Sequence, residues 1–246
     1  MKNNILSWCD EKITELKTHG INFENGVAKL PNYAVYDAPV AMISTFTYRN
    51  DIPNDLKASS LLCYFMPDIN LFRRIDKFEE DFAIITEYGG VCGFDLSPSI
   101  GMLRPRQRMS ILINSIFNAL LAIRGVKILP NCRIGDIKTQ TMVNSFPDKV
   151  SFISGMHGCK KYGFSEYGLY QLMLSVKSKR PPVLYIYGTM SIKEAKKLFW
   201  NENFKVITFP DRRNRVRNGS KAYVIYYENG TFHKQIYDYK QMGGVA

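Results

Sequence analysis

The sequence has no run of eighteen apolar residues, so we expect no transmembrane helix. Its first residues, Met1-Lys2-Asn3-Asn4, lack the apolar core of a signal peptide, which argues against secretion. No two cysteines lie within four residues of each other, which excludes a CxxC zinc pair. We therefore expect a cytoplasmic protein with reduced thiols at Cys9, Cys63, Cys92, Cys132 and Cys159.

Several catalytic motifs are also missing. The three histidines, His19, His157 and His233, form no HxH or HExxH spacing, which argues against zinc hydrolases. The sequence lacks GxxxxGK followed by Ser or Thr, and no GxGxxG follows a predicted strand, so the common forms of nucleotide hydrolysis are not expected. The absence of GxSxG argues against an α/β-hydrolase site.

Positive charge is abundant. Thirty-three Lys and Arg against 22 Asp and Glu give a formal net charge of +11 at pH 7. Residues 170–246 contain 14 Lys and Arg and five Asp and Glu, a balance of +9, whereas residues 1–169 carry +2. A basic C-terminal third is typical of a protein that binds nucleic acid, although a solvated basic surface has the same composition.

Hydrophobic periodicity predicts alternating strands and helices. The predicted strands are Val40–Phe46, Ser60–Met66, Phe82–Thr86, Val91–Phe94, Val126–Leu129, Val150–Ser154, Pro182–Tyr187 and Phe204–Phe209. Helices are predicted within Met1–Gly20 and over Pro105–Arg124, Thr139–Phe146, Glu166–Lys177 and Ser191–Trp200, the last with a capping box between Ser191 and Glu194. Asn229-Gly230, between Ala222–Tyr227 and Gly230–Tyr237, is a strong hairpin signal.

This order predicts an α/β fold with a mostly parallel sheet, helices on its faces and a C-terminal β-hairpin. A doubly wound sheet and a partial barrel are both compatible with the pattern, because strand order cannot be read from it. We divide the chain into an N-terminal helix and irregular segment, residues 1–60, and an α/β domain with a basic C-terminal third, residues 61–246.

Parallel α/β sheets bind ligands at the carboxyl ends of their strands. The polar residues that follow the predicted strands include Asp95, Asp136 and His157, our candidate catalytic residues. Asp95 and Asp136 could hold Mg²⁺ for phosphoryl transfer or divide acid and base roles. The structural alternatives are a turn-forming role for Asp95 and a helix cap for Asp136.

Two clusters of arginine are predicted to hold nucleic-acid phosphates, together with Arg133 at a predicted strand end. Arg104, Arg106 and Arg108 surround the start of the long helix, where the helix dipole favours anions. The second cluster precedes several tyrosines, a mixture typical of single-stranded nucleic-acid binding, and consists of Arg212, Arg213, Arg215, Arg217 and Lys221. The alternative is a basic loop beside an aromatic hairpin that packs on the core.

Four short phrases together suggest a family. They are Phe94–Pro98, the helix with Asn114 and Ala119, Gly125–Asn131 and Leu184–Gly188. The region from Leu61 to Lys240 resembles an uncharacterised domain-of-unknown-function family carried by phages, plasmids and integrative elements of Gram-positive bacteria. Members often have a Trp after the Pro-Asn phrase, whereas here Arg133 follows Cys132. The resemblance implies a mobile-element protein in the host cytoplasm and no established activity.

Three functions follow as hypotheses. The first is nucleic-acid binding, with metal-dependent processing at a carboxylate-lined strand-end site. The second is a non-enzymatic effector that binds a host replication or defence protein. The third is a small-molecule hydrolase or lyase acting on a phosphorylated or sugar ligand. Whether the protein is an enzyme stays open at this stage.

Overall fold

The N-terminal segment packs against the long central helix. A computed structural model describes residues 4–99, 101–132, 135–136, 139, 145–155 and 166–242. Helix α1 (Ile5–Thr18) begins at Asn4, whose side chain accepts a hydrogen bond from the Leu6 N–H. The short hairpin β1 (Phe23–Glu24) and β2 (Val27–Ala28) follows, and both α1 and β2 contact helix α4 (Arg104–Ile123).

Four strands form a parallel sheet in chain order: β3 (Met42–Thr45), β4 (Ser60–Cys63), β5 (Gly90–Cys92) and β6 (Ile128–Leu129). The connections contain the 3₁₀ helices η2 (Phe46–Asp51) and η3 (Asn54–Ser59), then α2 (Asp68–Ile75), α3 (Phe78–Ile85) and α4. The sheet thus begins inside residues 1–60, the segment that we separated from the α/β domain.

A second sheet has five strands. Strands β7 (Phe152–Gly155), β8 (Val183–Tyr187) and β9 (Lys205–Phe209) are parallel, and β10 (Tyr223–Glu228) and β11 (Thr231–Ile236) form an antiparallel hairpin beside β9. The accompanying helices are α5 (Glu166–Lys179), α6 (Ile192–Leu198), α7 (Arg212–Asn218) and α8 (Tyr239–Met242).

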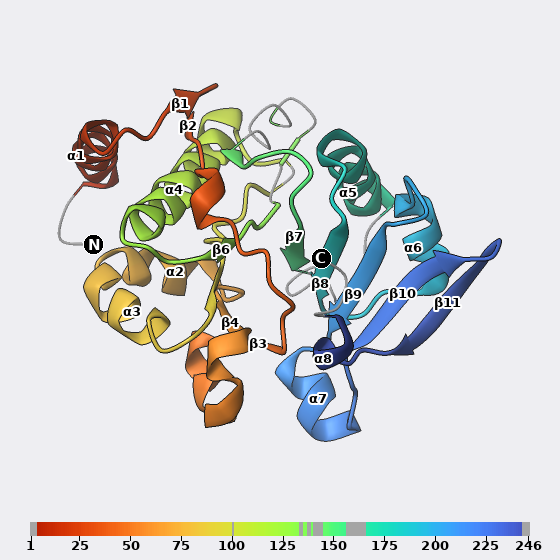
Figure 1. The fold of residues 1–246 in the computed structure, drawn as a ribbon. Helices are drawn as coiled ribbons and strands as arrows, with labels where there is room; N and C mark the ends of the chain where they lie inside the picture. Colours follow the sequence, from red (N-terminus) through yellow and green to blue (C-terminus); the bar gives the residue numbers. More distant parts are fainter. Residues whose placement is uncertain are drawn as a thin grey trace.

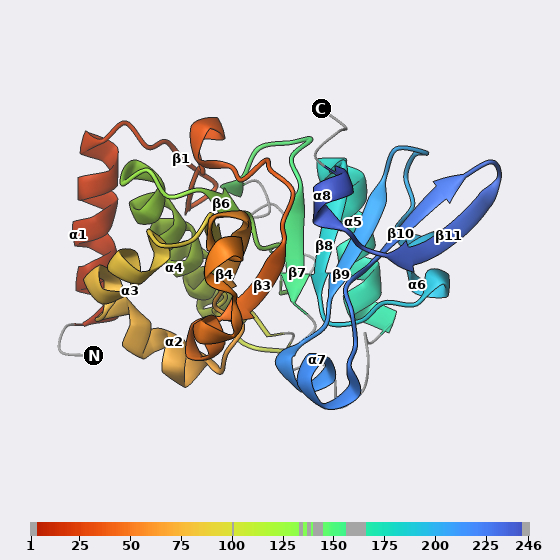
Figure 2. The same cartoon turned by 60° about the horizontal axis from the view of Figure 1, so that its bottom comes forward.

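Within the described residues, a parallel bridge between Asn131 and Ile153 joins the two sheets. Ile153 donates its N–H to the Pro130 carbonyl at 2.8 Å and accepts from the Cys132 N–H at 2.9 Å. The strands therefore follow one another from β3 to β11 without the reversal of order that defines a doubly wound sheet. Right-handed crossovers then place the crossover helices on one face, as in a partial barrel, and Figures 1 and 2 show α4 and α5 on the outer sides of the two sheets.

Alternate residues of the strands enter two different cores. Leu62 and Ile186 point to the helices, whereas Leu61, Cys63 and Tyr185 join an inner core to which every strand from β3 to β10 contributes. Residues outside the strands complete this inner core: Tyr36 and Val40 before β3, Tyr237 after β11, and Tyr239 of α8.

One buried hydrogen bond connects the two ends of this curved sheet. Tyr237, just after β11, donates its hydroxyl to the carbonyl of Val40, just before β3, at 2.9 Å. The bond joins residues 197 positions apart. The N-terminal and C-terminal strands are thereby held around the same inner core.

The structure confirms the α/β class, the parallel strands, the C-terminal hairpin and the Ser191–Glu194 capping box. The predicted strand Phe82–Thr86 is wrong, because this segment ends helix α3. Acidic residues in the first turn of α3 favour a helix N-terminus, and Phe78, Phe82 and Ile85 lie at helical spacing. The predicted helix Thr139–Phe146 lies mostly outside the described residues. Within those residues, no helix is long and apolar enough to cross a bilayer.

A buried carboxylate lies between α2 and α3. Asp81 has no exposed surface, and it accepts hydrogen bonds from Arg74 at 2.6 Å and from the Tyr64 hydroxyl at 3.3 Å. Burial outweighs these partners and raises the pKa of Asp81 from 3.8 to about 6. The folded protein therefore binds this proton more tightly than the unfolded chain does.

We predict that the contribution of Asp81 to the free energy of unfolding falls as the pH rises from about 4 to about 6. Urea denaturation across this range should show that the wild type loses roughly 2 kcal/mol relative to Asp81→Asn, which cannot titrate at this position. Parallel pH profiles for the two proteins would contradict the assignment.

Candidate functional site

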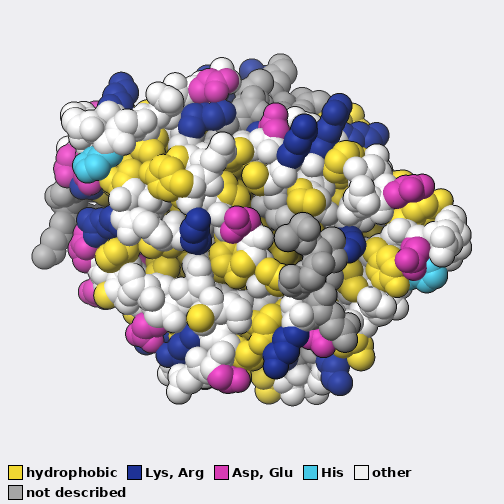
Figure 3. Space-filling model, viewed as in Figure 1, with side chains coloured by type: hydrophobic (Ala, Val, Ile, Leu, Met, Phe, Trp, Pro, Cys, Tyr) yellow, Lys and Arg dark blue, Asp and Glu magenta, His cyan; other side chains and the backbone are white. Residues whose placement is uncertain are grey.

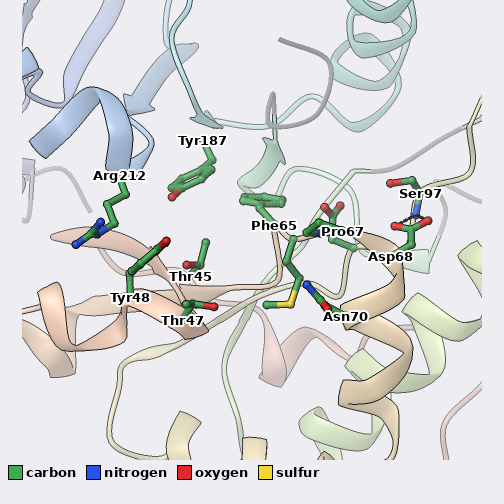
Figure 4. A pocket seen from close by; sticks show the side chains of 12 residues that line it. Thr45, Thr47, Tyr48, Phe65, Pro67, Asp68, Asn70, Ser97, Tyr187 and Arg212 are labelled. Carbon is green, nitrogen blue, oxygen red and sulfur yellow. Dashed lines mark hydrogen bonds between the residues drawn. The ribbon is translucent and has the colours of Figure 1, made fainter. Parts of the chain in front are cut away.

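A cavity of about 550 Å³ opens at the carboxyl ends of the strands. It is bordered by residues at the ends of five strands: Thr45 on β3, Phe65 after β4, Asp95 after β5, Tyr187 on β8 and Arg212 after β9. Figure 4 shows Arg212 and Tyr48 on one side, Asp68, Asn70 and Ser97 on the other, and Phe65 and Tyr187 between them. The cavity lies at the edge of the sheet that the strand-end rule selects.

Two aromatic rings form the apolar middle of the cavity. Phe65 and Tyr187 are stacked with their centroids 5.2 Å apart and their planes at 29°. Burial raises the pKa of Tyr187, so its phenol stays neutral. Gly155, the last residue of β7, lies against Phe65, and a Cβ atom there would come within 2.7 Å of the Phe65 ring. Glycine at position 155 therefore makes room for the ring pair.

The positive end of the cavity is built around Asp51. Arg212 donates from Nε to the Asp51 carboxylate at 2.9 Å, and Arg215 approaches the same oxygen at 3.3 Å. The Arg212 guanidinium lies over the Tyr48 ring, 4.2 Å from its centroid. The Asp51 carboxylate is thus shared by two guanidinium groups at this end of the cavity.

Two carboxylates line the cavity, and Asp68 lies opposite Arg212. Asp68 is in the first turn of α2, where the helix dipole favours an anion, and it accepts a hydrogen bond from the Ser97 N–H at 3.3 Å. Asp95 is buried and accepts from the Asn131 side chain at 2.6 Å, which ties the end of β5 to the end of β6. These carboxylates present acceptor oxygens, which suit a ligand hydroxyl or amine.

Helix α4 holds the loop that carries Asp95. The Asn114 amide exchanges two hydrogen bonds with the backbone of Leu96, at 2.8 and 2.9 Å. One turn later, Asn118 accepts from the Phe94 N–H at 2.8 Å. These bonds flank Asp95 on both sides and fix its backbone, so the carboxylate is positioned by the longest helix of the fold.

The structure places Asp136 in a different role. Its carboxylate accepts from the Gln107 amide at 2.9 Å, and its N–H donates to the same side chain at 2.8 Å. Asp136 does not line the cavity, and the carboxylate that faces it together with Asp95 is Asp68. Our sequence reasoning missed Asp68, although it directly follows Pro67 in the connection after strand β4, which ends at Cys63.

The other predicted site residues divide into three groups. His157 and Arg133 lie outside the described residues. Arg212 and Arg215 are partly buried on Asp51. The third group is exposed and, within the part of the chain that the structure describes, forms no ion pair; it consists of Arg104, Arg106, Arg108, Arg213, Arg217 and Lys221. Among the described residues, no group of three or more His, Cys, Asp or Glu side chains could hold a metal ion.

The basic run after β9 forms a short helix, α7. Asp211 begins it by accepting from the Asn214 N–H at 2.9 Å, and Gly219 ends it in a left-handed conformation, φ 59°. Arg213 and Arg217 point to solvent on this helix. Figure 3 shows Lys and Arg side chains over α7 at the lower edge of the molecule, with hydrophobic side chains between them.

The tyrosines beyond α7 serve mainly to pack the hairpin. Tyr223 exchanges hydrogen bonds with the backbone of Met190 at 2.5 and 2.8 Å. Tyr227 packs against Phe199 and Phe232, and Tyr237 is buried in the inner core. These contacts favour the structural interpretation of the tyrosines over a role as stacking platforms for bases.

We predict that Gly155→Ala destabilises the fold by about 1–3 kcal/mol, because the added methyl group overlaps the Phe65 ring. Urea denaturation measures the loss. Combining it with Phe65→Leu, which makes space for the methyl group, should recover part of it. Unchanged stability of the single variant would show that Gly155 does not set the position of Phe65.

Comparisons of the chain with protein-family models, curated proteins and solved structures find no match. The resemblance to the mobile-element family therefore stays a prediction from four short phrases.

Proposed function

We propose that the protein binds nucleic acid along the carboxyl-end edge of its sheet. The observation that carries the proposal is the exposure of five arginines on two elements of this edge, α4 and α7. Helix α4 starts after the loop that follows β5, and α7 starts directly after β9. Because consecutive parallel strands all end on this side, both sets of guanidinium groups border the same face of the molecule.

Electrostatics supports a polyanion as the ligand of this edge. Arg104, Arg106 and Arg108 lie in the first turns of a 20-residue helix, where the helix dipole adds to their positive charge. Arg213 and Arg217 add two cations on α7. These side chains can each contact a phosphate without first breaking an ion pair within the described ranges.

The proposal includes the Mg²⁺-dependent processing step predicted for Asp95 and Asp136. The position of Asp95 in the cavity wall beside Asp68 supports a role for its carboxylate. The pairing of Asp136 with Gln107 gives that residue a supporting role in the adjacent loop. The mobile-element origin and the host cytoplasm, which the resemblance implies, belong to the same proposal.

We predict that binding to labelled single-stranded DNA or RNA weakens steeply with salt. Arg213→Ala with Arg217→Ala should reduce the slope of log K against log [salt] by roughly 1.5, since each lost phosphate contact removes about 0.7–0.9. Fluorescence anisotropy across a salt series measures this slope. The control is Lys177→Ala with Lys205→Ala, which removes one charge from the last turn of α5 and one from the first residue of β9.

An equal loss in the control pair would assign the binding to net charge alone, and salt-independent or absent binding would reject the proposal. Adding Mg²⁺ to the same labelled strand tests processing. Any cleavage should disappear in Asp95→Asn with Asp136→Asn while binding persists; unchanged cleavage would remove both carboxylates from the mechanism. A stoichiometric protein captured from nuclease-treated lysate, with no strand binding, would favour the host-effector hypothesis.

A further inference from the structure

The strand-end cavity separates positive and negative charge. Arg212 forms its positive end, Asp68 lies on the opposite side with the Phe65–Tyr187 ring pair between them, and Asp95 also lines the cavity. A ligand that satisfies all three parts needs an anionic group at one end and hydrogen-bond donors at the other. Between the two it needs a compact body that can lie against aromatic rings.

A buried hydroxyl in the cavity has no partner. Thr45, the last residue of β3, is 8% exposed and lines the cavity, and its Oγ1 makes no hydrogen bond within the described part of the chain. Figure 4 shows the side chain near Tyr187, Tyr48 and Thr47. Buried hydroxyl groups in proteins are almost always hydrogen-bonded, so this one points to a group supplied by a ligand.

Contacts with Asp51 and Tyr48 hold the Arg212 side chain at the border of the cavity. Its Nε is held by Asp51 and its plane lies over Tyr48, while its two terminal nitrogens bond to no other residue in the described ranges. A guanidinium group fixed in this way offers a ready pair of donors to phosphate or carboxylate oxygens. Because the side chain is already held in place, it loses little further conformational entropy when an anion binds.

We infer that this cavity binds a phosphorylated sugar, with the phosphate monoester at Arg212 and Thr45 and the sugar hydroxyls at Asp68 and Asp95. A volume of about 550 Å³ lies within the range of small-molecule sites. The acidic wall disfavours a ligand that is anionic throughout, such as a polyphosphate. A neutral apolar ligand would leave the Thr45 hydroxyl without a partner.

The same chemistry occurs in three sources: a free sugar monophosphate, a free nucleoside monophosphate and the phosphorylated terminal nucleotide of a strand. Titration calorimetry with ribose 5-phosphate, AMP and a 5′-phosphorylated oligonucleotide distinguishes them, with ribose and inorganic phosphate as partial ligands. We expect ribose 5-phosphate or AMP to bind at least about tenfold more tightly than ribose or phosphate alone, because only the complete ligand contacts both ends of the cavity.

Matched variants locate the binding. Arg212→Gln should weaken binding of the phosphorylated sugar by about tenfold or more, whereas Arg213→Gln, its exposed neighbour, should change binding by less than about twofold. Thr45→Val should weaken binding without lowering the melting temperature of the ligand-free protein, since it removes an unpartnered hydroxyl. Ser60→Ala removes another buried, unpartnered hydroxyl that does not line the cavity, and it should leave binding unchanged.

Three results would overturn the inference: no binding of any phosphorylated sugar, equal binding of inorganic phosphate, or equal losses in Arg212→Gln and Arg213→Gln. If Arg212→Gln does not fold, the test is whether Thr45→Val weakens binding of the phosphorylated sugar more than Ser60→Ala does. Different measurements would reject the sugar-phosphate site and the nucleic-acid surface. Binding of ribose 5-phosphate without salt-dependent strand binding retains the cavity and rejects the nucleic-acid surface; the reverse result retains the surface and rejects the cavity.

Discussion

The unreversed order of the strands is the constraint on which the rest of the structure depends. Right-handed crossovers in this order place the crossover helices on one face, so the other face is buried by the sheet itself together with residues before β3 and after β11. Two contacts between distant parts of the chain hold the sheet in this curve. Tyr237 bonds to Val40 in the inner core, and Asp51, after β3, binds Arg212 and Arg215 on α7.

The same curvature creates the cavity and gives it two kinds of charge. Strands β3 and β9 lie far apart in the order of the sheet, yet Thr45 and Arg212, at their carboxyl ends, border one space. The loops after β4 and β5 bring Asp68 and Asp95 to the same cavity. The exposed arginines of α4 and α7 lie around this edge, so a strand-binding surface and a small-ligand site can occupy one face of the molecule.

Local sequence patterns predicted most helices and strands, whereas contacts between residues far apart in the sequence determine which side chains meet at the cavity. The Asn229-Gly230 hairpin and the Ser191 capping box depend on neighbouring residues and could be read directly. Phe82–Thr86 is a short apolar run, and such a run is compatible with a helix or a strand. Only the acidic residues upstream, in the first turn of α3, indicate the helix. The pairing of Arg212 with Asp51 joins residues 161 positions apart and leaves no local signal.

A double-mutant cycle between Asp51→Asn and the pair Arg212→Gln with Arg215→Gln tests the curvature of the sheet most directly. Urea denaturation is measured for the wild type, for Asp51→Asn, for the double arginine variant and for the protein with all three changes. The four free energies of unfolding give the coupling free energy between Asp51 and the two arginines of α7. If the sheet curves as described, the coupling is roughly 1 kcal/mol, the upper range for partly exposed ion pairs. Effects that add within about 0.3 kcal/mol would show that the two segments do not meet, and both the curved sheet and the shared cavity would then be wrong.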